Sequence, residues 1–292
     1  MNYTESAYAK LNLALDILGR RPDGYHDMRM VMQSIDLADQ VTLSPRQEPG
    51  ISVNTDLPYL PTGEGNIAAK AASRFFEATG LPFPGFDIDI LKQIPVCAGM
   101  AGGSSDGAAV LRILRRLYAP DMTEERLEEI GALVGSDVPY CVRGGTALAE
   151  GRGERLTDLP ALPPCWLAVC KPPCSISTPE LFSLVRLKKL RCHPDTAGMI
   201  AALERGDLEG VARRMYNVFE DVLPRRYVQV FEIKSALLGL GAISASMTGS
   251  GPTVFGLFRD REPAEQAADA LRRQVVSGVV CRAVGGGGHS FS

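Results

Sequence analysis

The chain has 292 residues, a formal net charge of −3, and 45% hydrophobic against 22% charged residues. This composition is typical of a globular protein long enough for two domains. The near-neutral charge gives no electrostatic footprint for nucleic acid or an anionic membrane. No run of about 18 or more apolar residues predicts a membrane span, and the N-terminus lacks a signal-peptide pattern. A cytoplasmic location is therefore expected, with neither nucleic acid nor membrane as a partner.

The cysteines and histidines argue against a zinc site. The chain has seven cysteines and three histidines, and no two cysteines form a C-x-x-C pair. Reduced, structurally passive thiols are expected, as is usual in the cytosol.

Residues 7–15 predict the first strand, because apolar and other residues alternate along it. Tyr8, Lys10 and Asn12 share the face opposite the leucines. A lysine among small and apolar residues is costly to bury unless it meets an anion. An edge strand with a solvated lysine is the simpler interpretation, and a strand facing a polar site is the alternative.

A tight turn follows at residues 22–24, where proline and glycine occupy the positions that turns favour. Tyr25 and His26 then begin the next strand, expected over 28–37, with a further strand at 41–43. This aromatic pair suits either stacking on a flat ring or a routine surface position.

The next elements are a short strand at 51–53, a helix, and a strand at 86–90. Asn66 is expected to cap the alanine-rich helix, which runs to Thr79 and stops at Gly80.

Residues 95–109 (PVCAGMAGGSSDGAA) join the end of this strand to a helix that continues to Tyr118. Glycines let the backbone approach a ligand closely, and the first turn of a helix offers free N–H groups at its positive end. The order strand, glycine loop, serine, helix predicts a phosphate site. The stretch fits neither the Walker nor the dinucleotide pattern, and a plain tight turn is the alternative.

Asp137 follows a helix that is expected to run from Thr123 to about Gly135, and it precedes an apolar strand pattern that ends at Ala149. An aspartate at such a junction is usually a turn or cap residue. A functional role for Asp137 is favoured here, because an acidic residue is the part of a phosphoryl-transfer site that is otherwise missing.

The proline-rich segment 158–164 predicts a hinge between domains. Beyond it, the pattern predicts an α+β layer with a second glycine stretch at 246–253 and a mobile tail. The expected elements are strand 166–170, a helix beginning at Pro179, helices 196–205, 207–222 and 227–239, strand 254–258, helix 263–275 and strand 279–283.

Three of these stretches, taken together, resemble the GHMP kinases, which include galactokinase, homoserine kinase and mevalonate kinase. Residues 9–12 (AKLN) are similar to the first family motif, 95–109 to the second, and 248–252 (TGSGP) to the third, in the family order. The resemblance implies an α+β fold of two domains with the active site in the cleft between them. Residues 1–159 would form a ribosomal-protein-S5-like nucleotide domain, 160–286 a ferredoxin-like layer, and 287–292 a flexible tail.

One branch of the family matches further at 21–26 (RPDGYH), 135–139 (GSDVP) and 151–154 (GRGE). The acceptor of that branch is a cytidyl diphosphate of a sugar alcohol. The resemblance implies that Tyr25 and His26 hold its cytosine ring and that Phe182 closes the same pocket.

The resemblance also implies roles for individual residues. Catalysis falls on Lys10 and Asp137. ATP, accompanied by Mg²⁺, would be bound by Pro95, Val96, Cys97, Ala98, Gly99, Met100, Ala101, Gly102, Gly103, Ser104, Ser105 and Asn66. The substrate would be bound by Asn12, Tyr25, His26, Phe182, Thr248, Gly249 and Ser250. Ser105 is the predicted metal contact.

In this mechanism Asp137 accepts the proton of the attacking hydroxyl, and Lys10 pairs with Asp137 and lowers its pKa. In a loose transition state the hydroxyl loses its proton late, so Asp137 orienting the hydroxyl is the alternative. There are two competing functions. One is another kinase of the family, which acts on homoserine or mevalonate, and the other is a non-catalytic ATP-binding module. The presence of both Lys10 and Asp137 argues against the module, and a small aliphatic acceptor has no ring for Tyr25 to stack on. A monomer and a homodimer are both compatible with the sequence.

Two positions depart from the family pattern. Met100 stands where leucine is usual, and Gly107 stands where alanine is usual, which should loosen its helix by roughly 1 kcal/mol.

Overall fold

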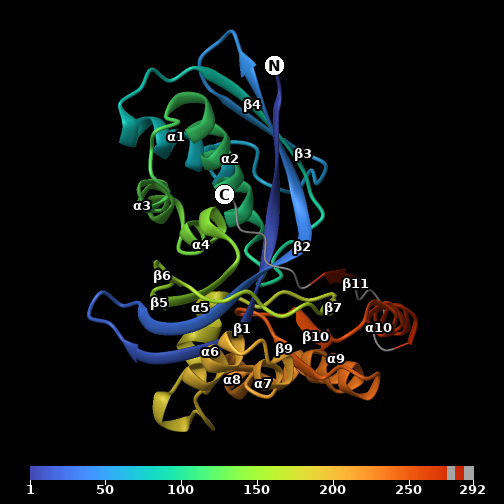
Figure 1. Ribbon diagram of the computed structural model, residues 1–292. Coiled ribbons are helices and arrows are strands. Elements are labelled where there is room, and N and C mark those ends of the chain that lie inside the picture. Colours follow the sequence, from blue (N-terminus) through green and yellow to red (C-terminus); the bar gives the residue numbers. More distant parts are fainter. Residues whose placement is uncertain (275–279, 286–292) are drawn as a thin grey trace.

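The computed structural model describes residues 1–274 and 280–285 (Figure 1). Within these residues, β1, β2, β3, β4, β5, β6 and β8 form a seven-stranded sheet, and β7, β9, β10 and β11 form a four-stranded one. The strands are β1 (Tyr3–Arg20), β2 (His26–Arg46), β3 (Ile51–Thr55), β4 (Gly85–Leu91), β5 (Thr146–Gly151), β6 (Arg155–Asp158), β7 (Trp166–Lys171), β8 (Tyr216–Asn217), β9 (Ser244–Met247), β10 (Val254–Phe258) and β11 (Val280–Gly285). The helices are α1 (Ile67–Thr79), α2 (Gly102–Tyr118), α3 (Glu124–Val134), α4 (Val138–Arg143), α5 (Thr178–Leu184), α6 (Thr196–Glu204), α7 (Leu208–Ala212), α8 (Phe219–Val222), α9 (Val228–Gly239) and α10 (Arg261–Gln274), with 3₁₀ turns at Leu187–Lys189 and Arg225–Tyr227.

The first sheet is organised around β1 and β2, which pair antiparallel along nearly their whole lengths. The strands predicted at 28–37 and 41–43 are one continuous strand. Asp39 interrupts the apolar pattern between them without breaking the strand. Its carboxylate is buried and accepts hydrogen bonds from the backbone N–H groups of Gln93 and Ile94.

Helices α1 and α2 cover one face of this sheet (Figure 1). As predicted, Asn66 caps α1 through its side chain and Gly80 ends it in the left-handed conformation. A Cβ on Gly107 of α2 would lie 3.0 Å from the Cγ2 atom of Ile67, at the start of α1. The glycine that departs from the family pattern therefore lets the two helices pack closely.

The second sheet has the strand order β11-β7-β10-β9. Together with α9 and α10 this is the β-α-β-β-α-β arrangement of a ferredoxin-like layer, which confirms the expected α+β fold. The helix predicted at 207–222 is wrong, because it is broken into α7 and α8 by β8, where Asn217 pairs with Leu15 of β1. The strand expected after Asp137 is also wrong at its start, since the helix α4 comes first.

The chain passes from one sheet to the other between Asp158 and Trp166. The boundary at 159/160 stays a prediction, and the tail 287–292 lies outside the described residues. Because β8 comes from the C-terminal half and joins the first sheet, the two halves are connected by backbone pairing.

The expectation of reduced thiols is wrong for Cys170, which is disulfide-bonded. Cys281 lies opposite Cys170 in the register of β7 and β11. Among the described residues, the cysteines 97, 141, 165, 174 and 192 are free thiols. None of the described helices has the length and apolar character needed to cross a membrane.

Candidate active site

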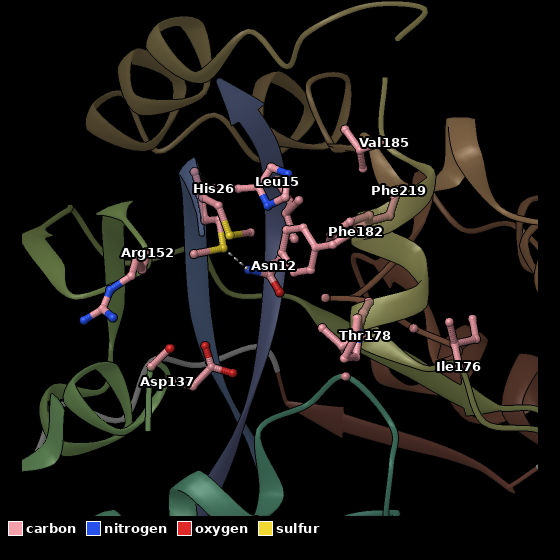
Figure 2. A pocket seen from close by; sticks show the side chains of 18 of the residues that line it. Asn12, Leu15, His26, Asp137, Arg152, Ile176, Thr178, Phe182, Val185 and Phe219 are labelled. Carbon is pink, nitrogen blue, oxygen red and sulfur yellow. Dashed lines mark hydrogen bonds between the residues drawn. The ribbon is translucent and has the colours of Figure 1, made fainter. Parts of the chain in front are cut away.

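A cavity of about 1010 Å³ is lined by residues from both halves of the chain (Figure 2). Asp137 and Arg152 lie on one side of it, Thr178 and Phe182 lie on the other, and β1 with Asn12 runs between them. The structure brings most of the predicted site residues to this one cavity. Those on its wall are Lys10, Asn12, Tyr25, His26, Cys97, Gly99, Ala101, Ser104, Asp137, Phe182, Gly249 and Ser250.

The glycine loop reaches the cavity in a conformation that side chains rarely adopt. Cys97 and Ala101 have φ angles of 52° and 58°, in the left-handed region, although neither is glycine. Such outliers persist where the surrounding structure enforces them, and they cluster at functional sites. Ala101 caps α2 without a side-chain hydrogen bond, so the first N–H groups of this helix stay available to an anion.

The second and third family motifs are in direct backbone contact. A Cβ on Gly99 would lie 2.4 Å from the carbonyl oxygen of Thr248, and one on Gly249 would lie 2.7 Å from the carbonyl oxygen of Gly99. The first motif joins them, because the N–H of Asn12 donates to Thr248 Oγ1 at 3.0 Å. Three stretches far apart in the sequence thus meet at the cavity.

Lys10 and Asp137 both face this cavity, but they are not paired with each other. Lys10 is 4% exposed and its Nζ donates to Asn12 Oδ1 at 2.7 Å. Within the described part of the chain it makes no ion pair with Asp137, so the predicted direct pairing is absent. Both charges act on the thiol of Cys141: burial and then the charge of Asp137 raise its pKa to about 12, while Lys10 opposes this.

An aromatic cluster forms the far end of the cavity. His26 stacks on Phe182 with ring centroids 4.8 Å apart and planes 20° apart, and Phe182 meets Phe219 edge-on at 4.9 Å. Tyr25 is 54% exposed, and the guanidinium carbon of Arg152 lies 5.0 Å from its ring centroid. This end of the cavity is suited to a flat ring.

The turn that carries Tyr25 and His26 is held by its own hydrogen bonds. The N–H of Arg21 donates to the carbonyl of Tyr25 at 2.8 Å, and the N–H of Tyr25 donates to the carboxylate of Asp23 at 3.1 Å. Burial, and then the charge of Arg20, lower the pKa of His26. The imidazole is therefore neutral at pH 7, the form that stacks on an uncharged base without desolvating a charge.

Several predicted ATP-binding residues do not line the cavity. Asn66 is committed to capping α1, and its amide also donates to the carbonyl of Pro61. Ser105, which is also the predicted metal contact, is 1% exposed and turned away from the cavity, and its hydroxyl donates to the carbonyl of Tyr8 at 2.7 Å. The other predicted ATP-binding residues that are absent from the cavity lining are Pro95, Val96, Ala98, Met100, Gly102 and Gly103.

The two serines of the loop should therefore respond differently to mutation. Ser104→Ala is expected to raise the KM for ATP several-fold without lowering Tm, because Ser104 lies on the cavity wall. Ser105→Ala is expected to lower stability by about 0.5–1.5 kcal/mol, because it removes the hydrogen bond from the buried hydroxyl to the carbonyl of Tyr8. Thermal melts and ATP-dependent kinetics of both variants check this, and the reverse pattern would contradict the orientation of the serines.

A buried charge cluster holds the segment that precedes the loop. Lys92 Nζ forms ion pairs with Asp39 and with Asp106, the latter at 2.7 Å. Burial raises the pKa of Asp106 to about 7, although the charge of Lys92 opposes this. The cluster connects β2, the segment after β4, and the N-terminal part of α2, so it anchors both ends of the loop. The signal for this charge cluster in the sequence was Lys92, which directly follows the strand β4.

The cavity wall also includes residues that the sequence did not single out, among them Arg152 and Thr178. Arg152 occupies the turn between β5 and β6, and Thr178 begins α5, where its hydroxyl lies 2.7 Å from that of Ser250. Arg152 stands inside 151–154, one of the stretches that carry the family resemblance, and this was its only signal.

Known proteins with a similar sequence or fold belong to one family. The model of the GHMP kinases N terminal domain matches residues 66–145, and the model of the GHMP kinases C terminal domain matches 199–277. The chain is 46% identical over 261 residues to the 4-diphosphocytidyl-2-C-methyl-D-erythritol kinase of Lachnoclostridium phytofermentans, covering 89% of both. It is 41% identical to the enzyme of that name from Clostridium botulinum, covering 95% of this chain and 99% of the relative.

Solved structures agree. A crystal structure of 4-(cytidine 5'-diphospho)-2C-methyl-D-erythritol kinase matches with a TM-score of 0.81 at 33% identity, covering 98% of this chain and 100% of the other. A homoserine kinase from Cytophaga hutchinsonii, at 18% identity and a TM-score of 0.75, covers 98% of this chain and 95% of its own, and it shares the fold alone. The chain therefore belongs to the GHMP kinase family, ATP-dependent kinases of small molecules, in the branch of its 4-diphosphocytidyl-2-C-methyl-D-erythritol kinase relatives.

Proposed function

We propose that this chain transfers the γ-phosphoryl group of ATP to the 2-hydroxyl of 4-diphosphocytidyl-2-C-methyl-D-erythritol, in the non-mevalonate pathway to isoprenoid precursors. One observation carries the proposal: a single cavity holds the glycine loop, Lys10 with Asp137, and the stacked rings of His26 and Phe182. A triphosphate, a reacting hydroxyl and a flat base each need one of these features. The names of relatives at 41% and 46% identity support the same acceptor. A cytoplasmic location is part of the proposal, and so is a monomer or homodimer.

The donor phosphates would lie against the loop from Cys97 to Ser104. Positive backbone φ angles at Cys97, Gly99 and Ala101 curve this loop ahead of α2. Free N–H groups and the positive end of the helix dipole favour the charge of a phosphate there.

Mg²⁺ would accompany ATP, and the cavity wall offers oxygen atoms that suit it. The hydroxyl of Ser104 is such an oxygen, and oxygen is the ligand that Mg²⁺ prefers. Within the described residues, no group of three or more His, Cys, Asp or Glu could hold a metal ion. That suits an ion whose other ligands are phosphate and water, and bound there it supplies charge neutralisation of the phosphates.

The reacting hydroxyl would lie between the loop and Asp137. Asp137 orients it and accepts its proton as the bond to phosphorus forms. Lys10 stabilises the negative charge that develops on the transferring group, and its hydrogen bond to Asn12 fixes the position of its ammonium group. Because Lys10 makes no ion pair with Asp137, its charge remains available for the phosphoryl oxygens.

The acceptor would be selected at the aromatic end. A cytosine ring can stack there beside Phe182 and Tyr25, with His26 neutral. Homoserine and mevalonate have no such ring, so for them these side chains would supply no stacking.

An ATP-coupled assay tests this proposal with four acceptors: 4-diphosphocytidyl-2-C-methyl-D-erythritol, homoserine, mevalonate and galactose. Turnover with the first alone is expected. Turnover only with one of the others would refute the acceptor and leave the kinase activity intact. ATP binding without turnover of any acceptor would favour a non-catalytic module.

Phe182→Ala is expected to raise the KM for the cytidyl acceptor by about 10- to 100-fold, the range that a lost base–aromatic stack commonly costs. The KM for ATP should stay unchanged, because Phe182 lies at the end of the cavity away from the glycine loop. Steady-state kinetics with each substrate varied in turn check this. Phe83→Ala, which removes a phenylalanine that is 40% exposed outside the cavity, is the matched control. Equal rises in both KM values would count against a role in acceptor binding.

A further inference from the structure

Asn217 is buried behind the cavity, and all of its side-chain donors are used. Its Nδ2 donates to the carbonyl oxygens of Met247 at 2.7 Å and Gly249 at 2.9 Å, while its Oδ1 accepts from the N–H of Phe219 at 3.0 Å. It is 1% exposed. A carboxamide is the side-chain group of this size that donates twice and accepts once in this way.

Glu220, three residues further along the chain, holds the same segment through an N–H group and a hydroxyl. Its Oε1 accepts from the N–H of Met247 at 2.8 Å and from the hydroxyl of Ser246 at 3.0 Å. Its Oε2 pairs with Lys234 of α9. Asn217 thus binds the carbonyl group of Met247, and Glu220 binds its N–H group, at the end of β9. This strand end leads directly into the loop of the third family motif, which is called the third glycine loop below.

The third glycine loop, residues 247–251, touches both sides of the reaction. On the donor side, Gly249 packs on the backbone of Gly99. On the acceptor side, the hydroxyl of Ser250 lies 2.7 Å from that of Thr178, at the start of the helix that carries Phe182. Figure 2 shows Thr178 and Phe182 on the same wall of the cavity.

We infer that Asn217 is a positioning residue, which sets the third glycine loop and through it the alignment of the donor loop with the acceptor helix. Asn217 itself does not line the cavity. It fixes the carbonyl groups of Met247 and Gly249, which flank Thr248. Thr248 in turn accepts from the N–H of Asn12 on the catalytic strand. The inference rests on the proposed function only in that the aligned groups are ATP and an acceptor hydroxyl.

Asn217→Asp tests this. The aspartate keeps the shape of the side chain and the oxygen that accepts from the N–H of Phe219. It replaces the NH₂ group, which donates to two carbonyl oxygens, by a carboxylate oxygen that cannot donate to them. At pH 8 the variant is expected to lose on the order of 10- to 100-fold in kcat, since a misplacement near 1 Å has such an effect. Burial raises the pKa of a carboxyl group, and the protonated acid regains one O–H donor. The ratio of variant to wild-type kcat is therefore expected to rise several-fold between pH 8 and pH 6.

The control makes the same chemical change at an exposed site. Asn54→Asp on β3 should show wild-type kcat at both pH values. Thermal melts at each pH separate alignment from folding. A variant with lowered Tm but wild-type kcat and KM values would overturn the inference, and so would a loss of kcat that does not depend on pH. If the wild type prefers another acceptor, the comparison is made with that one, so the acceptor and the role of Asn217 fail independently.

Discussion

Asp137→Asn is expected to lower kcat by about 100- to 10,000-fold, the usual contribution of a positioned general base. The asparagine keeps the shape of the side chain at the start of α4 and removes only its ability to take a proton. Asp137 makes no side-chain hydrogen bond to its own helix, so the fold should not depend on its charge. Both KM values should stay within about threefold, because an interaction made only in the transition state affects kcat. The coupled assay and a thermal melt measure the two effects.

The control for this change is Asp121→Asn, at an exposed position before α3, which should leave kcat unaltered. A variant of Asp137 that keeps most of its kcat would show that the general-base assignment is wrong. A loss of only about tenfold would favour orientation of the hydroxyl instead, as a loose transition state permits. A fall in Tm that accompanies the fall in kcat would show that the fold does depend on the charge of Asp137.

The parts of the site that the sequence predicts well are those specified by neighbouring residues. The capping of α1 by Asn66 and its end at Gly80 follow from local backbone preferences. The glycine loop ahead of α2 is similarly local, and its residues Gly99 and Ser104 line the cavity.

The parts that the sequence could not predict depend on contacts across the chain. Whether Ser104 or Ser105 faces the cavity is decided by how α2 packs on β1, which turns Ser105 toward the carbonyl of Tyr8. The helix expected at 207–222 breaks at Asn217 because its side chain bonds to a loop some thirty residues later. Helical periodicity contains no information on such a partner.

Among residues that have no functional group in their side chain, Gly99 is expected to show the largest loss of activity when it is substituted. An alanine Cβ there would lie 2.4 Å from the carbonyl oxygen of Thr248 and 3.0 Å from the nitrogen of Gly251, and Gly99 has a φ of +73°. Both neighbours are backbone atoms, so no side-chain rotation relieves the collision. The two glycine loops must separate, and Gly99→Ala is expected to lower kcat/KM for ATP by about 100-fold or more.

Gly80→Ala is the control that isolates this collision. Gly80 has a similar φ of +66°, but a Cβ there has no atom within 4 Å. It should therefore lose only the cost of the left-handed conformation, about 1–2 kcal/mol of stability, at unchanged kcat/KM. Gly99→Ala should lose at least this much stability, because the backbone collision adds to the strain, and it should also lose its activity. Equal kinetic effects in the two variants would mean that backbone strain is responsible, whereas an effect confined to Gly99 shows that catalysis requires contact between the two loops.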